Sequence, residues 1–267
     1  MTEPDIVIVA DAAAAARTAA ERIAMTLQLA VETRDRADWV TTGGSAAVGI
    51  YRGLAAPPLR GAVPWDRVHT WWGDDRFVPR DHPLSNVRAF DAIVLDAADG
   101  EEGTGFDAFE RVAIPIANVH PFRTGETIGA GRDAAACAAA LAAELRAEGL
   151  TEVDRWPVFD LVLLGIGADG HVLSVFPSSA AFDSEDLALA IPAPTHIEPH
   201  VGRVTLNPAI VRVAREVIVV ASGAAKAPIL AEILGPDRDP RRLPAQLARR
   251  SGATWILDEA AAAQLPG

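Results

Sequence analysis

A short apolar run at residues 159–164 limits the possible folds of this chain more than any other sequence feature. The run reads FDLVLL, without regular polar alternation, which predicts a strand buried on both faces of a parallel sheet. It leads into a glycine-rich turn, GIGADGH, whose three glycines allow a backbone path that side chains would block. Asp169 and His171 lie in this turn, and open α/β sheets bind their ligands where such strands end.

Strand-like and helix-like segments alternate along most of the chain. Apolar runs that predict further strands occur at residues 6–9, 39–42, 68–72, 217–221 and 255–257. Helical patterns occur at residues 12–34, 46–54, 87–95, 132–148 and 224–234, with Ser85 and Asn86 as the expected cap of the third helix. This alternation predicts one α/β domain over residues 1–267: an open, largely parallel, Rossmann-like sheet with helices on both faces.

The net charge of −12 limits the partners that the protein can bind. Nucleic acids and anionic membranes attract basic surfaces, so we expect neither as a partner. An anionic small molecule would need cations gathered locally, against the overall field of the chain. Among the 24 Lys and Arg residues, Lys226 is the only lysine. That marks it as a candidate for a role that arginine cannot fill, although chance explains a single lysine equally well.

Cysteine usage and hydropathy indicate the cellular setting. Cys137 is the only cysteine, which excludes a disulfide framework and a cysteine-based metal site, and we expect it to be a small buried side chain. No segment is long and apolar enough to span a bilayer, and the first residues lack the pattern of a signal peptide. We therefore expect a cytoplasmic protein without membrane partners, either a monomer or a small homo-oligomer.

Four candidate sites follow predicted strands, and two of them offer groups that bind anions. Gly43, Gly44 and Ser45 form a turn that opens a helix, where free backbone N–H groups and the helix dipole favour a phosphate. An ordinary turn with Ser45 as the helix cap is the alternative. Lys226 lies one turn into the helix that follows residues 217–221. Its ammonium suits a phosphate, although a surface lysine is the commoner case.

The other two sites carry carboxylates beside a cation or an imidazole. Asp74 and Asp75 precede Arg76, which they would orient toward an anion or oxyanion, unless the segment is an ordinary solvated loop. Histidine titrates near neutral pH, so His171 is a candidate general base with Asp169 beside it. Simple turn-forming roles for both residues are the alternative. The glycine spacing differs from G-x-G-x-x-G, so we exclude a dinucleotide loop.

Two histidines four residues apart, His196 and His200, suggest a metal site. Pro199 disfavours a regular helix between them, and no cluster of Asp, Glu or His in the sequence completes the ligand set, so we expect no metal ion. Arg203, at the start of a short predicted strand, is a further candidate for binding an anion.

Several motifs together carry a family resemblance. In chain order they are TGGS at 42–45, WGDDRFVP at 72–79, SN at 85–86, NVHPF at 118–122, FDLVLLGIGADGH at 159–171, SVFP at 174–177, RVTLN at 203–207 and GAAKA at 223–227. This combination resembles the 6-phosphogluconolactonase family, within the glucosamine/galactosamine-6-phosphate isomerase superfamily.

The resemblance implies hydrolysis of 6-phospho-D-glucono-1,5-lactone to 6-phospho-D-gluconate in the oxidative pentose phosphate pathway, without a cofactor. His171 would activate water and return the proton to the leaving ring oxygen. Arg76 would stabilise the oxyanion, and Asp169 or Asp74 would orient His171 or Arg76. The residues expected to hold the phosphate are Gly43, Gly44, Ser45, Lys226 and Arg203. No G-x-S-x-G elbow is present, which favours direct attack by water.

Two positions depart from the family pattern. Asp75 stands where the family usually has glutamate, which shortens one carboxylate. Val172 and Leu173 stand where the family usually has a Thr-Ala pair, and their larger side chains thicken the wall beside His171. Neither departure removes a functional group that the reaction needs.

Two alternative functions remain. Glucosamine-6-phosphate deaminases/isomerases share the D-G-H turn. However, they typically carry D-E-Y where this chain has Asp74, Asp75 and Arg76, and N-E-P where it has V-F-P. A non-catalytic sugar-phosphate sensor is the second alternative. Such sensors often carry a DNA-binding module, for which this chain offers no spare N-terminal segment and no basic surface pattern.

Overall fold

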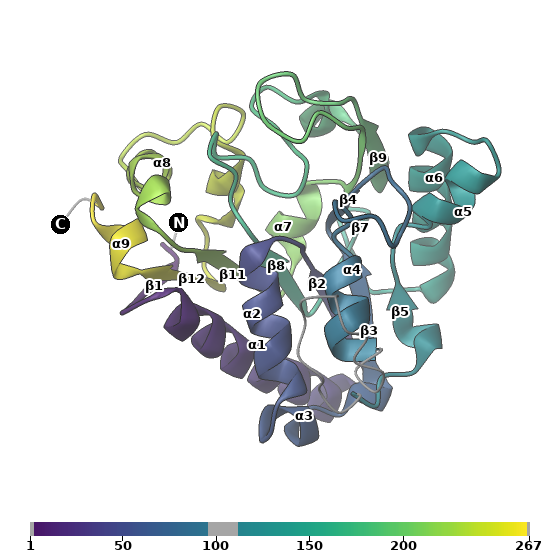
Figure 1. Ribbon diagram of the computed structural model, residues 1–267, viewed down its shortest axis with the longest axis horizontal. Helices are drawn as coiled ribbons and strands as arrows, with labels where there is room; N and C mark the ends of the chain where they lie inside the picture. The colour runs from purple at the N-terminus through teal and green to yellow at the C-terminus, as the bar shows by residue number, and fades with distance from the viewer. Residues whose placement is uncertain (1–2, 96–111, 266–267) are drawn as a thin grey trace.

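Seven parallel strands form the central sheet of the protein, which the computed structural model describes over residues 3–95 and 112–265 (Figure 1). Every neighbouring pair in this sheet is parallel. In sheet order the strands are β1 (Asp5–Val9), β12 (Ala253–Asp258), β11 (Glu216–Ala221), β8 (Leu161–Leu164), β2 (Ala37–Thr41), β3 (Val68–Trp72) and β5 (Val119–His120). The predicted α/β class with a largely parallel sheet is confirmed.

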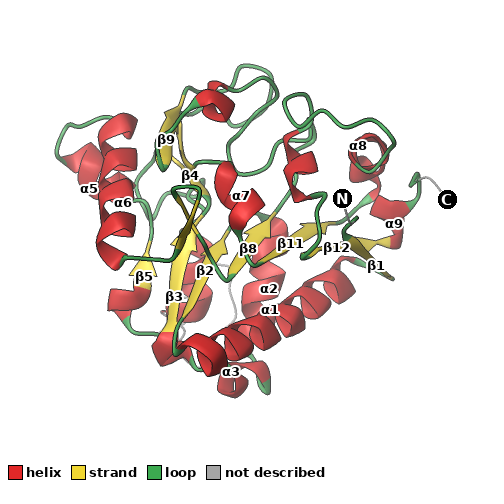
Figure 2. Cartoon of the chain, turned by 180° about the vertical axis from the view of Figure 1, so that it is seen from behind, coloured by secondary structure: helices red, strands yellow, loops and turns green. Residues whose placement is uncertain are grey.

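Helices cover both faces of this sheet, as predicted. The longer helices are α1 (Ala12–Arg34), α2 (Ser45–Ala55), α6 (Ala134–Glu148) and α8 (Ala227–Ile233). The shorter ones are α3 (Leu59–Ala62), α4 (Arg88–Phe90), α5 (Thr124–Gly129), α7 (Ala209–Val213) and α9 (Glu259–Ala262). α1 packs against β2, β11 and β12. α2 lies in front of the strands in Figure 1, whereas α7 lies in front of β8 in Figure 2, which shows the molecule from behind.

Short 3-10 segments complete the regular structure. They are η1 (Trp65–Arg67), η3 (Ile116–Asn118), η4 (Ala180–Asp183), η5 (Ala224–Lys226) and η6 (Pro244–Ala248).

None of the helices in the described part of the chain is long and apolar enough to cross a membrane. Cys137 is buried, as predicted.

Small residues bring α1 and α2 close together. A Cβ atom at Gly49 would lie 2.8 Å from the Cβ of Ala16, and one at Gly53 would lie 2.9 Å from the Cβ of Ala20. Carbon atoms pack best at about 3.5–4.0 Å, so the helices reach this separation only with glycine at both positions. Because α2 begins at the loop that follows β2, the contact also fixes the start of α2 relative to the sheet.

A second, antiparallel sheet contains residues 74–76, which the sequence suggested to be a loop. Asp74–Arg76 forms β4, which pairs with β10 (Arg203–Leu206), and β10 pairs in turn with β9 (Ala188–Ile191). The carboxylates of β4 are buried, so the alternative of a solvated charged loop is wrong. Three charged residues have no apolar alternation, and the sequence pattern therefore did not reveal the strand. A separate short hairpin joins β6 (Glu152–Val153) to β7 (Trp156–Pro157).

The helix predicted at residues 87–95 is only partly regular. α4 covers Arg88–Phe90 and continues as a π-helical turn, η2 (Asp91–Leu95). The cap of α4 is Val87, so the prediction that Ser85 and Asn86 cap this helix is wrong. Both side chains take part in the site described below.

We predict that Gly53→Ala lowers the free energy of unfolding. Alanine gains about 1 kcal/mol of helix propensity over glycine, but overpacking against Ala20 costs about 1–3 kcal/mol. Gly61→Ala is the matched control, because a Cβ there meets nothing within 4 Å, and it should leave stability unchanged or raise it. Urea denaturation measures both variants, and equal changes would show that the α1–α2 contact is not tightly packed.

Candidate active site

The four loops expected to carry the site follow four neighbouring strands. β11, β8, β2 and β3 lie side by side in the sheet, so their carboxyl ends meet at one edge. The chain reverses its direction across the sheet between β2 and β8, because later strands continue to one side of β2 and to the other side of β8. In open α/β sheets, ligands bind in the crevice at such a reversal.

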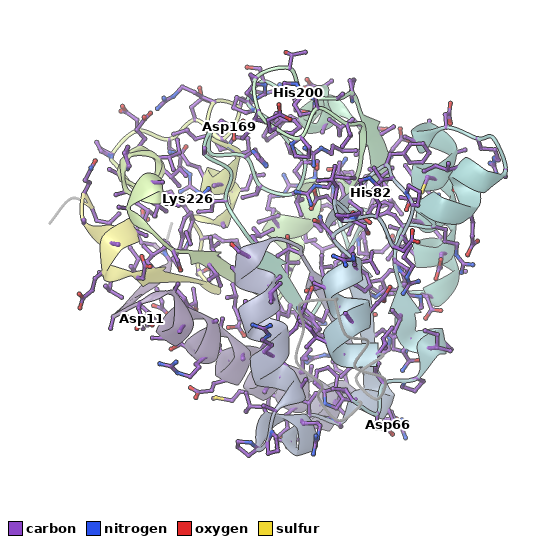
Figure 3. All side chains as sticks on the ribbon, viewed as in Figure 1. Asp11, Asp66, His82, Asp169, His200 and Lys226 are labelled. Carbon is purple, nitrogen blue, oxygen red and sulfur yellow. The ribbon has the colours of Figure 1, made fainter. Side chains whose placement is uncertain are left out.

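A cavity of about 650 Å³ lies at this edge. Asp169 and Lys226 lie in the upper half of Figure 3, whereas Asp66, just before β3, lies at its lower edge. The cavity is lined by all predicted site residues except Asp169, namely Gly43, Gly44, Ser45, Asp74, Arg76, His171, Arg203 and Lys226. Asp169 itself does not line the cavity, but it is hydrogen-bonded to His171, whose ring does.

The turn after β8 holds Asp169 against the imidazole of His171. Asp169 Oδ1 lies 2.6 Å from His171 Nδ1 and accepts a hydrogen bond from the His171 backbone N–H at 3.2 Å. Gly167 allows this contact, because a Cβ atom there would lie 1.9 Å from His171 Nδ1. Gly170 has a φ of +82°, in the left-handed region that favours glycine. The position of the histidine ring therefore requires glycine at position 167, and the backbone path of the turn favours glycine at position 170.

The carboxylate of Asp169 is stabilised in its ionised form. Partial burial alone would raise its pKa, but the hydrogen bond and charge of His171, together with the hydrogen bond of His196, hold the pKa well below its usual range. An ionised carboxylate only accepts hydrogen bonds, so neutral His171 donates from Nδ1. Its Nε2 is then an acceptor, and the ring can take a proton from water in the cavity.

Two arginines lie opposite each other on β4 and β10. Arg203 is the register partner of Arg76. Arg76 Nη1 donates to Asn86 Oδ1 at 2.5 Å and to the backbone oxygen of Leu84 at 2.9 Å, and Arg203 Nη2 donates to the backbone oxygen of Pro199 at 2.9 Å. Within the described ranges, the buried Nε atoms of both arginines have no hydrogen-bond partner.

This pair of guanidinium groups is suited to an anion. Burial, and then the charge of Arg76, lower the pKa of Arg203, although the carboxylates of Asp74 and Asp75 oppose this. Buried donors are normally satisfied, and an anion in the cavity would both accept their hydrogen bonds and offset the repulsion between the two cations.

A buried carboxylate shapes the turn that holds Arg76. Asp75 Oδ1 accepts hydrogen bonds from the backbone N–H groups of Arg76 and Asn86, both at 2.7 Å, and its Oδ2 accepts one from the Ser85 hydroxyl at 3.0 Å. Burial raises the pKa of Asp75 to about 7, against the opposing effect of these hydrogen bonds. Asp75, the shorter carboxylate at this position, therefore supports the site from outside the cavity lining, by holding the backbone of Asn86 in place.

Asn86 links Asp74 to Arg76. Its Nδ2 donates to the backbone oxygen of Asp74 at 2.9 Å, while its Oδ1 accepts from Arg76. The Ser174 hydroxyl donates to Asp74 Oδ2, which ties this strand to the loop after β8. Asn86 also explains Gly43, because a Cβ at that position would lie 2.1 Å from Asn86 Oδ1. Asp74 therefore acts on Arg76 through Asn86.

Leu173 forms part of the cavity wall, as the departure at Val172 and Leu173 suggests. Its φ is +55°, and its side chain fills the space beside Gly73, where a Cβ atom would lie 2.5 Å from Leu173 Cδ2. Val172 is buried away from the solvent. The larger side chain of Leu173 is accommodated because Gly73 leaves room for it.

The turn formed by Gly43, Gly44 and Ser45 lies on the opposite side of β8 from Lys226. Gly44, with a φ of +88°, is the cap of α2, and Ser45 is its first residue, so the alternative with Ser45 as the cap is wrong. Lys226 Nζ donates to the backbone oxygen of Ile166 at 2.7 Å. Partial burial lowers the pKa of Lys226, although the charge of Asp169 opposes this. Backbone N–H groups at the start of α2 and the lysine ammonium therefore line the same cavity.

The two histidines considered as a metal pair have different partners. His196 Nε2 lies 2.8 Å from Asp169 Oδ2, and His200 Nε2 lies 3.0 Å from Glu198 Oε1. Across residues 3–95 and 112–265, no group of three or more His, Cys, Asp or Glu side chains is arranged to hold a metal ion.

Sequence analysis missed the roles of three residues in this site. Asn86 and Ser174 stand in motifs that carry the family resemblance, so a signal for them was present. His196 was considered as a metal ligand or a substrate contact, but not as a partner of Asp169. It lies 27 residues from Asp169 in the sequence, and no motif connects the two.

Comparisons with known proteins identify the family of the chain. The family model described as Glucosamine-6-phosphate isomerases/6-phosphogluconolactonase matches residues 10–256. A 6-phosphogluconolactonase of Mycobacterium leprae is 34% identical over 93% of each chain, and one of Synechocystis sp. is 33% identical over 88% of each chain. The structure of 6-phosphogluconolactonase from Trypanosoma cruzi has a TM-score of 0.83 at 26% identity, and covers 99% of this chain and 98% of its own. The chain therefore belongs to the glucosamine-6-phosphate isomerase/6-phosphogluconolactonase family.

Proposed function

We propose that the protein hydrolyses 6-phospho-D-glucono-1,5-lactone to 6-phospho-D-gluconate, a step of the oxidative pentose phosphate pathway. The observation that carries the proposal is the position of His171, which is held by Asp169 and lines one cavity with Arg76. Ester hydrolysis needs a base for water and a cation for the charge that develops on the carbonyl oxygen. The relatives named 6-phosphogluconolactonase, at 33–34% identity, support this choice of substrate.

The reaction proceeds by direct attack of water. His171 Nε2 accepts a proton from water while the water oxygen forms a bond to C1 of the lactone. The carbonyl oxygen becomes an oxyanion, and Arg76 stabilises its charge. When the tetrahedral intermediate collapses, the bond from C1 to the ring oxygen breaks and His171 returns its proton to that oxygen. Water supplies every atom that the product gains, and His171 and Arg76 serve as the base and the cation, so this mechanism includes no step on a cofactor or a metal ion.

The phosphate of the substrate is held by the turn at the start of α2 and by two cationic side chains. Gly43, Gly44 and Ser45 offer backbone N–H groups at the start of α2, where the helix dipole favours negative charge. Lys226 and Arg203 add positive charge from two other elements that line the cavity. These local cations offset the unfavourable field of a chain whose net charge is −12.

We also infer that the chain works as one domain in the cytoplasm, as a monomer or a small homo-oligomer and without a nucleic-acid partner. Its acidic composition supports the absence of nucleic-acid binding.

We predict that the purified protein consumes freshly made 6-phosphogluconolactone well above the spontaneous rate, and that His171→Gln lowers this activity about 100-fold or more. Glutamine keeps a polar side chain but cannot take the proton of water. The rate of acid release, corrected for background hydrolysis at each pH, measures both proteins. Near-normal activity of His171→Gln would overturn the assignment of the base, and ammonia release from glucosamine 6-phosphate would favour the deaminase alternative.

A pair of glycine variants controls for this test. Gly167→Ala should abolish most activity, because its Cβ would displace the ring of His171. Gly129→Ala, at the end of α5 and outside the cavity lining, meets nothing within 4 Å, and it should keep normal activity. Circular dichroism and thermal unfolding confirm that both variants are folded.

We predict that Lys226→Met raises the KM for the phosphorylated lactone about 10- to 100-fold, because a hydrogen bond to a charged group contributes about 1.5–3 kcal/mol. Methionine keeps the apolar stem and removes only the ammonium. D-glucono-1,5-lactone, which lacks the phosphate, is the control substrate, and its KM should change little. An equal change for both lactones would remove Lys226 from the phosphate site.

A further inference from the structure

Asp169 serves two imidazole rings with its two oxygens. Its Oδ1 lies 2.6 Å from Nδ1 of His171, and its Oδ2 lies 2.8 Å from Nε2 of His196. The mechanism above uses the first contact only. The second contact comes from the loop between β9 and β10, far from the turn after β8 in the sequence.

An aromatic ring holds the two histidines in place. Phe176 lies against His171, with ring centroids 4.7 Å apart, and meets the His196 ring edge to face at 5.5 Å. Edge-to-face contacts of this kind favour one orientation of the rings. The orientation of His196 is therefore set by Phe176 on one side and by Asp169 on the other.

The contact has a direct effect on the carboxylate. The terminal torsion of an aspartate is broad, so a carboxylate whose partners all lie on one oxygen can turn about its last bond. An ionised Asp169 only accepts hydrogen bonds, and neutral His196 donates to it from Nε2. With a donor on each oxygen the carboxylate cannot turn, and Oδ1 remains on Nδ1 of His171. That contact keeps the proton on Nδ1 and leaves Nε2 free to act as the base.

We propose that His196 is a positioning residue for the hydrolytic reaction: it holds the second oxygen of Asp169, and thereby keeps His171 in the tautomer and orientation that activate water. The inference rests on the proposed function for its kinetic consequence, but the contact between His196 and Asp169 exists whatever the substrate.

The contact contributes little to the stability of the fold. The side chain of His196 is 50% exposed, and hydrogen bonds at exposed sites add little to folding. Substitution of His196 should therefore leave a folded protein, so that an effect on the reaction is separable from unfolding.

The pH dependence of the site follows from the shared carboxylate. The charge of a protonated His171 is enough to hold Asp169 beside it. The hydrogen bond of the neutral ring to Asp169 depends instead on the carboxylate orientation that His196 maintains. Loss of His196 therefore disfavours the neutral, active form of the base. Other charged groups near the pair are Lys226, whose charge interacts with that of Asp169, and Glu198, which pairs with His200 on the His196 loop.

The test compares three variants. His196→Ala removes the donor, and we expect kcat to fall about 3- to 10-fold with little change in KM, while the acid limb of the kcat/KM profile moves to higher pH. His196→Gln places an amide donor at nearly the position of Nε2 and should restore both properties. His200→Ala removes a histidine of the same loop that contacts Glu198 instead, and it should behave like the wild type.

Three kinetic outcomes would overturn the proposal. They are an unchanged kcat and acid limb in His196→Ala, equal losses in His196→Ala and His200→Ala, and a failure of His196→Gln to restore activity. In the first case the contact has no effect on the base, in the second the loop as a whole matters, and in the third the donor is not the essential feature.

A substrate-free measurement separates this proposal from the proposed function. An NMR titration follows the ring signal of His171, which is assigned by its loss in His171→Gln. The midpoint should move to higher pH in His196→Ala and stay in place in His200→Ala. If the protein lacked lactonase activity, the proposed function would fail, and an unmoved midpoint would independently overturn the role of His196.

Discussion

The pairing of β2 with β8 is the constraint on which the whole site depends. Two residue pairs join these strands, and Asp160 strengthens the junction. Its Oδ2 accepts the backbone N–H of Asp38 at 2.8 Å, and its Oδ1 pairs with Arg34 at 2.7 Å. Because the chain continues in opposite directions on the two sides of this junction, the loop after β2 and the loop after β8 diverge and leave a cavity between them.

Local patterns were sufficient to predict the main sheet and the loops that carry the site. The apolar runs of β8 and β11 and the alanine-rich helical pattern of α1 are local signals that the sequence shows directly. Parallel strands then gather their carboxyl ends, so residues as distant as Ser45 and Lys226 were expected near one another. Only the topology, which is non-local, shows that the four strands are neighbours.

The features that sequence analysis missed depend on tertiary contacts. β4 is stabilised as a strand by pairing with β10, and its own three residues carry no strand pattern. Asn86 has the chemistry of a helix cap and was interpreted as one, but its amide is held by Arg76 and Asp74 instead. The contact of His196 with Asp169 depends on how a long loop folds back over the sheet, which no local pattern records.

Leu173 and Gly73 join two parts of the site that come from different loops. Leu173 fills the place that a side chain at position 73 would take, and the neighbouring Ser174 is hydrogen-bonded to Asp74. The loop that carries His171 therefore cannot shift without moving the strand that carries the guanidinium of Arg76. Charges fixed in this way stabilise a transition state without reorganising during the reaction. We expect the protein to stay rigid during the reaction, while the lactone ring changes shape.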